Sequence, residues 1–242
     1  MVAFWRDRVR HLDGHAIHEV DGVVVCLSNL PDDAQNVALI EREPVDASAA
    51  IAEARGVFDA HGRSVGFDLE RGRHPNVEAE LRADGLEVLV RQPAMAVRLE
   101  DVEPPRVPKG VEIVRASEPG LLAELVEVEA GAFETDRAVA QGLLSPSQLS
   151  LPNVRFYAAI VDGRAVAQGM TNAHRGAVGV FGVATLPGFR RRGIGRAITA
   201  FAIDDVRDEA DLAWLQSTEM GRSLYERMGF RPVSEWNVWV RR

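Results

Sequence analysis

The chain has few of the features that mark secreted, membrane-embedded or nucleic-acid-binding proteins. No apolar run in its 242 residues approaches the roughly 18 residues of a membrane span. Residues 1–15 lack the apolar centre of a signal peptide and are patterned like an amphipathic helix. With only one cysteine, Cys26, the chain cannot form an internal disulfide. We therefore expect a cytoplasmic protein with no membrane partner.

An excess of basic charge is also absent. The formal net charge is −8 and the isoelectric point is near 5.3, so we expect no nucleic-acid partner. Apolar residues make up 46% of the chain, which supports a real core and argues against disorder. Cys26 lies in the apolar run Val23–Leu27, which predicts a buried strand in which the thiol serves packing.

The most informative segment is Val180–Ala197, VFGVATLPGFRRRGIGRA, which predicts a strand, a glycine- and arginine-containing loop and the start of a helix. Glycines let the backbone approach a diphosphate, and the free N–H groups and dipole of the first helical turn favour its charge. Arginines in the loop add charge-assisted hydrogen bonds. The segment therefore predicts a site for a phosphorylated ligand.

The same segment has weaker interpretations. Two glycines alone are a weak signal, and a run of arginines is more often a solvated surface. A dinucleotide fingerprint fits poorly, because Ile198 stands where a third small residue should bring the helix against the strand. A Walker loop is excluded, because no Gly-Lys-Ser/Thr follows.

A second motif lies downstream. Residues 213–217 predict a short strand, and residues 220–230 predict a helix that ends at a glycine. The two motifs together resemble the GNAT superfamily of acetyl-coenzyme A-dependent N-acetyltransferases. The pyrophosphate loop of that family, Arg/Gln-x-x-Gly-x-Gly/Ala, and its later L-Y-x-x-x-G-F helix are matched by Arg190, Gly193 and Gly195 and by Leu224, Tyr225, Gly229 and Phe230. The resemblance covers roughly Val111 to the C-terminus.

The resemblance implies which residues bind acetyl-CoA. In the family, the fourth core strand splays from the fifth, and its free backbone groups bind the pantetheine and the carbonyl oxygen. The residues of this chain that match the cofactor site are Val183, Ala184, Thr185, Arg190, Arg191, Arg192, Gly193, Ile194, Gly195 and Arg196. No metal is implied.

Two residues are the predicted catalytic groups. Tyr225 matches the family's usual general acid, a phenol that protonates the leaving thiolate. Without the motif, packing of the tyrosine ring in the core would be the default interpretation. Ser217, at the end of the preceding predicted strand, is a candidate to orient Tyr225 or a water.

The general base stays unassigned. Many relatives carry a carboxylate on the strand that matches Ala177–Thr185, and none is present there, so we expect a water relay. Glu129, Glu134 and Asp136 are candidates to line an amine site, although ordinary exposed acids are the better interpretation of each. The acceptor stays open between a small amine, an amino acid, an antibiotic and a protein N-terminus.

The proline-containing segment 99–110 predicts a boundary, with one domain at 1–104 and another at 105–242. After it, strands at 111–115, 156–161, 165–172 and 177–185 and helices at 118–132 and about 137–144 are expected. The strands Arg231–Val233 and Trp236–Val240 are expected to complete a mixed sheet with helices on both faces. Trp236 and Trp239, three apart, should point to opposite faces. The fold class is thus α/β, a mixed sheet of GNAT-like form.

The first hundred residues repeat this plan in reduced form, with the turn Asp21-Gly22 matching Asp162-Gly163. In place of the arginine loop the first copy has Glu41–Asp46, without glycine and with net negative charge, and Leu81 stands where the second copy has Tyr225. We interpret it as a degenerate GNAT-like copy that binds no cofactor. We expect residues 111–242 alone to be poorly soluble, because the first copy would cover apolar surface of the second.

These patterns predict an N-acetyltransferase that transfers the acetyl group of acetyl-CoA to a primary amine on a small molecule or peptide, in a monomer or homodimer. The main alternative is a non-catalytic acyl-CoA-binding or sensing protein, which retention of Tyr225 disfavours and the missing strand carboxylate favours. A nucleotide-binding protein that uses the arginine loop is the third.

Overall fold

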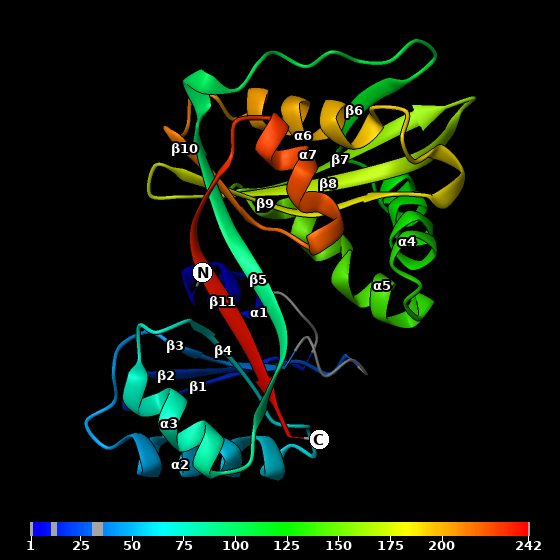
Figure 1. Cartoon of the computed structure of the whole chain (residues 1–242). Coiled ribbons are helices and arrows are strands. Elements are labelled where there is room, and N and C mark those ends of the chain that lie inside the picture. Colours follow the sequence, from blue (N-terminus) through cyan, green and yellow to red (C-terminus); the bar gives the residue numbers. More distant parts are fainter. Residues whose placement is uncertain (1, 11–13, 31–35, 242) are drawn as a thin grey trace. The chain divides into compact units, whose positions relative to one another are not determined.

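The computed structural model describes residues 2–10, 14–30 and 36–241, and it divides into two compact units (Figure 1). Unit 1 is formed by residues 1–93 together with 234–242, and unit 2 by residues 94–233. These units divide the chain differently from the predicted boundary after residue 104, because residues 94–104 belong to unit 2 and residues 234–242 to unit 1. The number and limits of independently folding domains stay a prediction.

Within its described residues, unit 1 is a five-stranded mixed sheet with three helices. Its strand order is β1-β2-β3-β4-β11, and only the β3–β4 pair is parallel among β1–β4. The strands are β1 (Ala16–Val20), β2 (Val23–Leu27), β3 (Val37–Ile40), β4 (Gly66–Glu70) and the end of β11 (Arg231–Val240). The helices are α1 (Val2–Arg10), α2 (Ala47–Ala60) and α3 (Pro75–Ala83).

The side chains of unit 1 alternate between two apolar cores. Val23 and Val25 of β2 join Phe58 of α2 on one face, while Val24 and Cys26 lie on the other face with Val9 of α1. All five residues of β2 are buried, as predicted for the run around Cys26. Burial raises the pKa of the Cys26 thiol to about 12, so the group stays a neutral packing residue.

Unit 2 is a six-stranded mixed sheet in the order β5-β10-β9-β8-β7-β6. Its strands are the end of β5 (Glu87–Arg98), β6 (Glu112–Ala116), β7 (Val154–Val161), β8 (Arg164–His174), β9 (Ala177–Thr185) and β10 (Leu212–Gln216). Its helices are α4 (Pro119–Phe133), α5 (Arg137–Leu143), α6 (Ile194–Asp204) and α7 (Glu219–Arg227), with short 3₁₀ turns at Leu99–Asp101, Pro146–Ser150 and Pro187–Phe189.

Helices cover both faces of the unit 2 sheet, as predicted. Residues of α4 and α5 pack with β7 and β8 in one core, and residues of α6 and α7 pack with β9 and β10 on the other side (Figure 1). The end of β9 contributes to both cores, because Ala184 packs on the α4 side and Val183 on the α6 side. The helix and strand positions expected between residues 111 and 230 are confirmed to within a few residues.

The last two expected strands are a single strand in the structure. Residues 231–240 form β11, and Trp236–Val240 pair antiparallel with β4 of unit 1. The place beside β10 is taken by residues 94–98 of β5, a strand that was not predicted. The sequence does not indicate this strand, because Pro93 cannot donate to a strand ladder and charged residues lie on both sides of it.

The Asp-Gly turns of the expected repeat and the expected orientation of two tryptophans are both present. Asp21-Gly22 and Asp162-Gly163 each join two antiparallel strands through two residues with positive φ, at 33° and 84° and at 49° and 75°. This is the backbone that a tight hairpin needs to match the strand twist. Trp239 and Trp236 lie on opposite faces, with Trp239 buried in the α2–α3 core and Trp236 packed on the α1 side.

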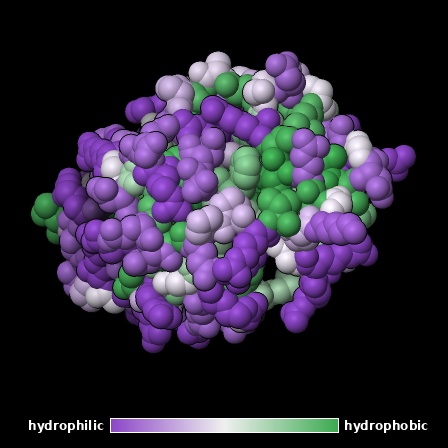
Figure 2. Space-filling view, turned by 90° about the horizontal axis from the view of Figure 1, so that it is seen from above, coloured by the Kyte–Doolittle hydropathy of each residue, from purple (hydrophilic) through white to green (hydrophobic). Residues whose placement is uncertain are grey.

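Figure 2 shows a surface that is mostly hydrophilic, with hydrophobic side chains gathered in one area. Apolar residues that are only partly buried beside the α6 core include Val111, Val161, Phe189 and Phe201. Among residues 2–10, 14–30 and 36–241, no helix is both long and apolar enough to cross a bilayer.

These strand pairings predict how fragments of the chain should behave when they are expressed separately. A fragment of residues 111–242 lacks Met95 and Val97, which are buried beside β10, and keeps residues 236–240 without β4. We expect this fragment to aggregate, and a matched fragment of residues 94–233 to be soluble, because it keeps every strand of unit 2. Gel filtration of both fragments tests this, and a soluble monomer from residues 111–242 would contradict it.

Candidate functional site

The loop between β9 and α6 places an open helix N-terminus at the end of a strand. Gly193 is the N-cap of α6 and has a φ of 82°, a conformation that side-chain-bearing residues rarely adopt. No side chain caps this helix, and its first internal hydrogen bond runs from the Ala197 N–H to the Gly193 carbonyl, at 3.0 Å. The N–H groups of residues 194–196 therefore precede the internal ladder and suit an anion.

The arginines of the loop hold its shape. Arg190 donates from Nε to the Thr185 carbonyl at 3.0 Å and from Nη2 to the Ala132 carbonyl, in the last turn of α4, at 2.8 Å. Arg192 donates to the Gly188 carbonyl at 2.8 Å, and its guanidinium lies 5.0 Å from the centre of the Phe189 ring. The positive charges thus gather at the start of α6 while their donors fix the backbone.

The remaining two arginines differ in their surroundings. Arg196, in the first turn of α6, pairs with Glu103 at 2.8 Å. Arg191 is exposed and has a φ of 64°, so the chain turns sharply at this residue. Ile194 is buried in the core under α6, and Gly195 lies in the first turn with Leu224 nearby. Predicted site residues 190–196 are therefore brought together in one loop and helix start.

The matching connection in unit 1 has the opposite character. Asp46 is the N-cap of α2, and its carboxylate accepts a hydrogen bond from the Ala49 N–H at 3.0 Å. Glu43 in the same connection pairs with His74 at 2.8 Å. An internal carboxylate therefore occupies the end of α2 that corresponds to the open end of α6.

Strand β9 contains a bulge that sequence reasoning missed. Ala184 and Thr185 pair with Gln168 and Ala167, but the register shifts by one residue before Phe181 pairs with Met170. Gly182 lies at this shift with a φ of 57°, the left-handed conformation that begins a glycine bulge. A glycine inside a predicted strand was the available signal.

Beyond the bulge, β9 continues past its ladder with β10. The parallel pairing joins Ala177, Val178 and Gly179 to residues 212–214, and residues 183–185 lie beyond it. This agrees with the splayed strands that the family resemblance implies. Val183, Ala184 and Thr185 are thus not paired with β10, and the Thr185 carbonyl accepts a hydrogen bond from Arg190.

Tyr225 lies on α7 with its ring packed among the apolar residues on the α6 side of the sheet. Its side chain is 9% exposed, and the ring meets Phe230 edge-on with centroids 5.8 Å apart. Burial raises the pKa of the Tyr225 phenol to about 12. The hydroxyl therefore remains protonated at neutral pH and is able to donate a proton.

Ser217 precedes α7 and is buried. Its hydroxyl donates to the Thr218 carbonyl at 2.6 Å, and Thr218 in turn caps α7 by accepting from the Gly221 N–H at 3.2 Å. These bonds fix the start of the helix that carries Tyr225. A role of Ser217 in orienting Tyr225 or a water stays a prediction.

The three candidate acids have different surroundings. Asp136 caps α5 by accepting from the Ala138 N–H at 2.7 Å, and Glu134 is the exposed left-handed residue that ends α4. Glu129 of α4 accepts a short hydrogen bond from the side-chain amide of Gln168 on β8. In the part of the chain that the structure describes, no three His, Cys, Asp or Glu side chains gather to hold a metal ion.

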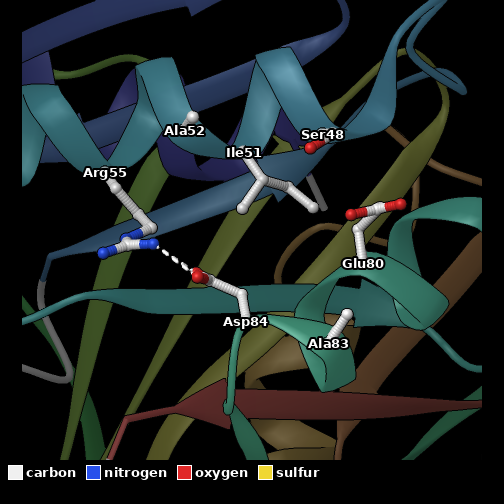
Figure 3. A pocket seen from close by; sticks show the side chains of 7 residues that line it. All are labelled: Ser48, Ile51, Ala52, Arg55, Glu80, Ala83 and Asp84. Atoms are coloured by element: carbon white, nitrogen blue, oxygen red, sulfur yellow. Dashed lines mark hydrogen bonds and ion pairs between the residues drawn. The ribbon is translucent and has the colours of Figure 1, made fainter.

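Two shallow hollows lie elsewhere on the units. One of about 220 Å³ lies between α2 and α3 of unit 1, where Arg55 and Asp84 form an ion pair at 2.5 Å (Figure 3). The other, of about 180 Å³, lies in unit 2 beside α6 and includes Arg196, Ala200 and Glu103. The arginine loop itself is an exposed surface, which suits an extended ligand that lies along the backbone.

The comparison with protein families gives a match over the segment that contains this loop. Residues 152–232 match the family model described as an acetyltransferase (GNAT) domain. The resemblance predicted from the two motifs is confirmed. The matched segment contains the whole of β8, β9, the arginine loop, α6, β10 and α7. No curated protein sequence matches the chain.

Solved structures extend the likeness to almost the whole chain. A GCN5-related N-acetyltransferase from Kribbella flavida is 23% identical, with a TM-score of 0.80 over 99% of this chain and 94% of its own. A tandem GNAT protein from the clavulanic acid biosynthesis pathway is 16% identical, with a TM-score of 0.67 over 95% and 84%. A GCN5-related N-acetyltransferase from Sphaerobacter thermophilus is 14% identical, with a TM-score of 0.66 over 90% and 80%. The predicted GNAT-like α/β fold is confirmed.

The contacts of Arg190 predict a stabilising role that its neighbour lacks. Replacing Arg190 by methionine removes donors to two carbonyls, at Thr185 and Ala132. We expect a loss of about 1 kcal/mol, which for a chain of this size lowers the Tm by roughly 2–4 °C. The exposed Arg191, replaced by methionine, is the matched control. Equal melting temperatures for the two variants, measured by calorimetry, would contradict the bracing role.

Proposed function

We propose that the protein is an acetyl-CoA-dependent N-acetyltransferase that acetylates a primary amine of a small molecule or peptide. The observation that carries the proposal is the open N-terminus of α6, which follows directly from the end of β9 where the ladder to β10 has ended. The family match over residues 152–232 supports acetyl transfer as the chemistry. The cytoplasm is the proposed compartment, since a lone thiol such as Cys26 needs no oxidising environment.

The loop and strand supply complementary groups for the cofactor. The N–H groups at residues 194–196 and the charges of the loop arginines would hold the diphosphate of acetyl-CoA. Backbone groups of residues 183–185, which are not paired with β10, would hydrogen-bond the pantetheine arm and the thioester carbonyl. Bound acetyl-CoA supplies an activated acyl group, whose thioester carbon is open to attack by an amine.

Tyr225 is the proposed general acid. As the amine attacks the thioester carbon, the C–S bond breaks and negative charge develops on sulfur, which takes the phenolic proton. The raised pKa of Tyr225 means that the phenol carries its proton at neutral pH. The packed ring holds the hydroxyl in a fixed direction.

We propose that unit 1 binds no acetyl-CoA. The Asp46 carboxylate already satisfies the start of α2, and it would repel a diphosphate there. The hollow between α2 and α3 adds no free positive charge, because Arg55 is paired with Asp84 and Glu80 lies beside them (Figure 3). One cofactor per chain is therefore expected.

The alternative, an acyl-CoA-binding or sensing protein without turnover, rests on the absence of a carboxylate from β9. Turnover of acetyl-CoA against a panel of amines, followed as thiol release, separates the two. Acetyl-amine product from any member of the panel supports the enzyme, and tight binding of acetyl-CoA with no product from any member supports the alternative.

Gly193 allows a charge-specific test of the cofactor site. Asparagine and aspartate have the same shape and both tolerate a left-handed backbone better than other residues. Like charges about 4 Å apart repel by ~1 kcal/mol in water and ~4 kcal/mol near a protein surface. We therefore expect Gly193→Asp to bind acetyl-CoA at least about fivefold more weakly than Gly193→Asn. Titration calorimetry measures both and gives the number of sites, and equal affinities or two sites in the wild-type chain would contradict the assignment.

Tyr225→Phe separates chemistry from binding. The ring keeps its packing against Phe230, and only the proton donor is lost. We expect kcat to fall by roughly 10²–10⁴-fold with little change in the dissociation constant of acetyl-CoA. Near-normal turnover would assign Tyr225 to packing.

A further inference from the structure

A buried carboxylate–amide pair lies on the α4 side of the β9 bulge. Gln168 of β8 is 3% exposed, and its Nε2 donates a short hydrogen bond to Oε2 of the half-buried Glu129 on α4. A Cβ placed on Gly182 would lie 3.7 Å from the same Nε2. Gln168 also pairs in register with Ala184, one of the proposed backbone groups for the thioester. The pair therefore adjoins the bulge and the proposed acyl site.

The pair is costly as a purely structural contact. The Oε1 of Gln168 is buried and accepts no hydrogen bond from any residue of the described ranges 2–10, 14–30 and 36–241. An unsatisfied buried acceptor destabilises the folded state, whereas apolar residues would pack with the neighbouring core of Leu125, Met170 and Ala184 without that cost. We therefore interpret the Gln168 amide as a group that orients the Glu129 carboxylate.

Two other carboxylates of α4 have partners of their own. On α4, Glu124 accepts from the Ala165 N–H at 3.0 Å and Glu127 pairs with Arg137 at 2.6 Å. The described part of β9 carries no titratable side chain, and Arg164 and His174, at the two ends of β8, are both exposed. Arg190 reaches the carbonyl of Ala132, three residues after Glu129.

We propose that Glu129, positioned by Gln168, binds the acceptor as an ammonium ion and takes its first proton. This inference rests on the proposed acetyltransferase function and names its acceptor as a primary ammonium, whose three N–H donors suit a fixed carboxylate. Proton transfer to Glu129 leaves a neutral amine, whose nitrogen forms the C–N bond as the C–S bond breaks. A second nitrogen proton replaces the one that Tyr225 gives to sulfur, and Glu129 releases the first to solvent.

Glu129→Gln tests this assignment without removing the contact, because the amide oxygen of the new side chain still accepts from Gln168. With primary alkyl amines, amino acids and short peptides as acceptors, we expect kcat/KM at pH 7 to fall by roughly 10²–10⁴-fold. The loss should shrink as pH rises toward the pKa of the amine itself, because free amine then needs no base. The dissociation constant of acetyl-CoA should not change.

Two further variants complete the design. Gln168→Met removes the amide donor to Glu129 and should lower kcat/KM by about tenfold, a positioning effect smaller than loss of the base. Glu127→Gln, on the same helix but paired with Arg137, should keep the wild-type rate and pH profile.

Each outcome of these experiments supports or overturns the role proposed for Glu129. A wild-type rate and pH profile in Glu129→Gln, with or without a lower Tm, would overturn the role of Glu129 while acetylation by the wild-type chain leaves the proposed function standing. A wild-type chain that binds acetyl-CoA and acetylates none of the amines would overturn both. A pH-dependent loss in Glu129→Gln and none in Glu127→Gln supports the assignment.

Discussion

The proposed site depends on one constraint, that α6 begins with its N–H groups unsatisfied immediately after β9 ends. Gly193 makes this possible, because its positive φ turns the chain into the helix without a side chain that would cap it. Arg190 then fixes the loop from outside by binding the carbonyls of Thr185 and Ala132. The same guanidinium thus links the strand of the proposed acyl site to the last turn of α4. A change in either element is expected to be felt in the other.

The two units differ in how the helix after the third strand begins. In unit 1 the helix that follows the third strand is closed by its own carboxylate, Asp46, which makes the connection stable without a ligand. In unit 2 no side chain caps the equivalent helix, α6, so the N–H groups of its first turn lack intramolecular acceptors. An open end is a sign of function for this reason, since a ligand supplies the missing acceptors. Asp46 and Gly193 therefore distinguish a scaffold from a proposed binding site.

The acceptor side follows a related principle. Gln168 leaves one buried oxygen without a donor in the described part of the chain, and it uses its nitrogen to hold Glu129. Groups that are held at a cost in stability are expected where direction matters more than packing. The β9 bulge at Gly182 adjoins this arrangement, since a Cβ at Gly182 would lie 3.7 Å from the amide nitrogen of Gln168. In our proposal, Glu129 thus acts from α4 in place of the carboxylate that β9 lacks.

Much of the molecule was readable from local sequence. Helices and strands between residues 111 and 230, the two Asp-Gly hairpins and the glycine–arginine loop depend on neighbours within a few positions, and the resemblance to GNAT proteins followed from two such motifs. Tyr225 was found in the same way, whereas its burial and raised pKa needed the packed core. The open N-terminus of α6 was also predictable, because glycine at a helix start is a local signal.

Tertiary structure alone decided which strands complete each sheet and which side chains meet. Residues 94–98 pair with β10 and residues 236–240 with β4, although each is far away in sequence from its partner. Likewise, Arg190 reaches Ala132 and Gln168 reaches Glu129 across 58 and 39 positions. Strand ladders use backbone groups that every residue other than proline has, and side-chain hydrogen bonds use polar groups that many residues have. No local sequence pattern therefore specifies which residue is the partner. The sequence by itself determined the elements and the cofactor motif, and the packing of those elements determined the acceptor side of the proposed site.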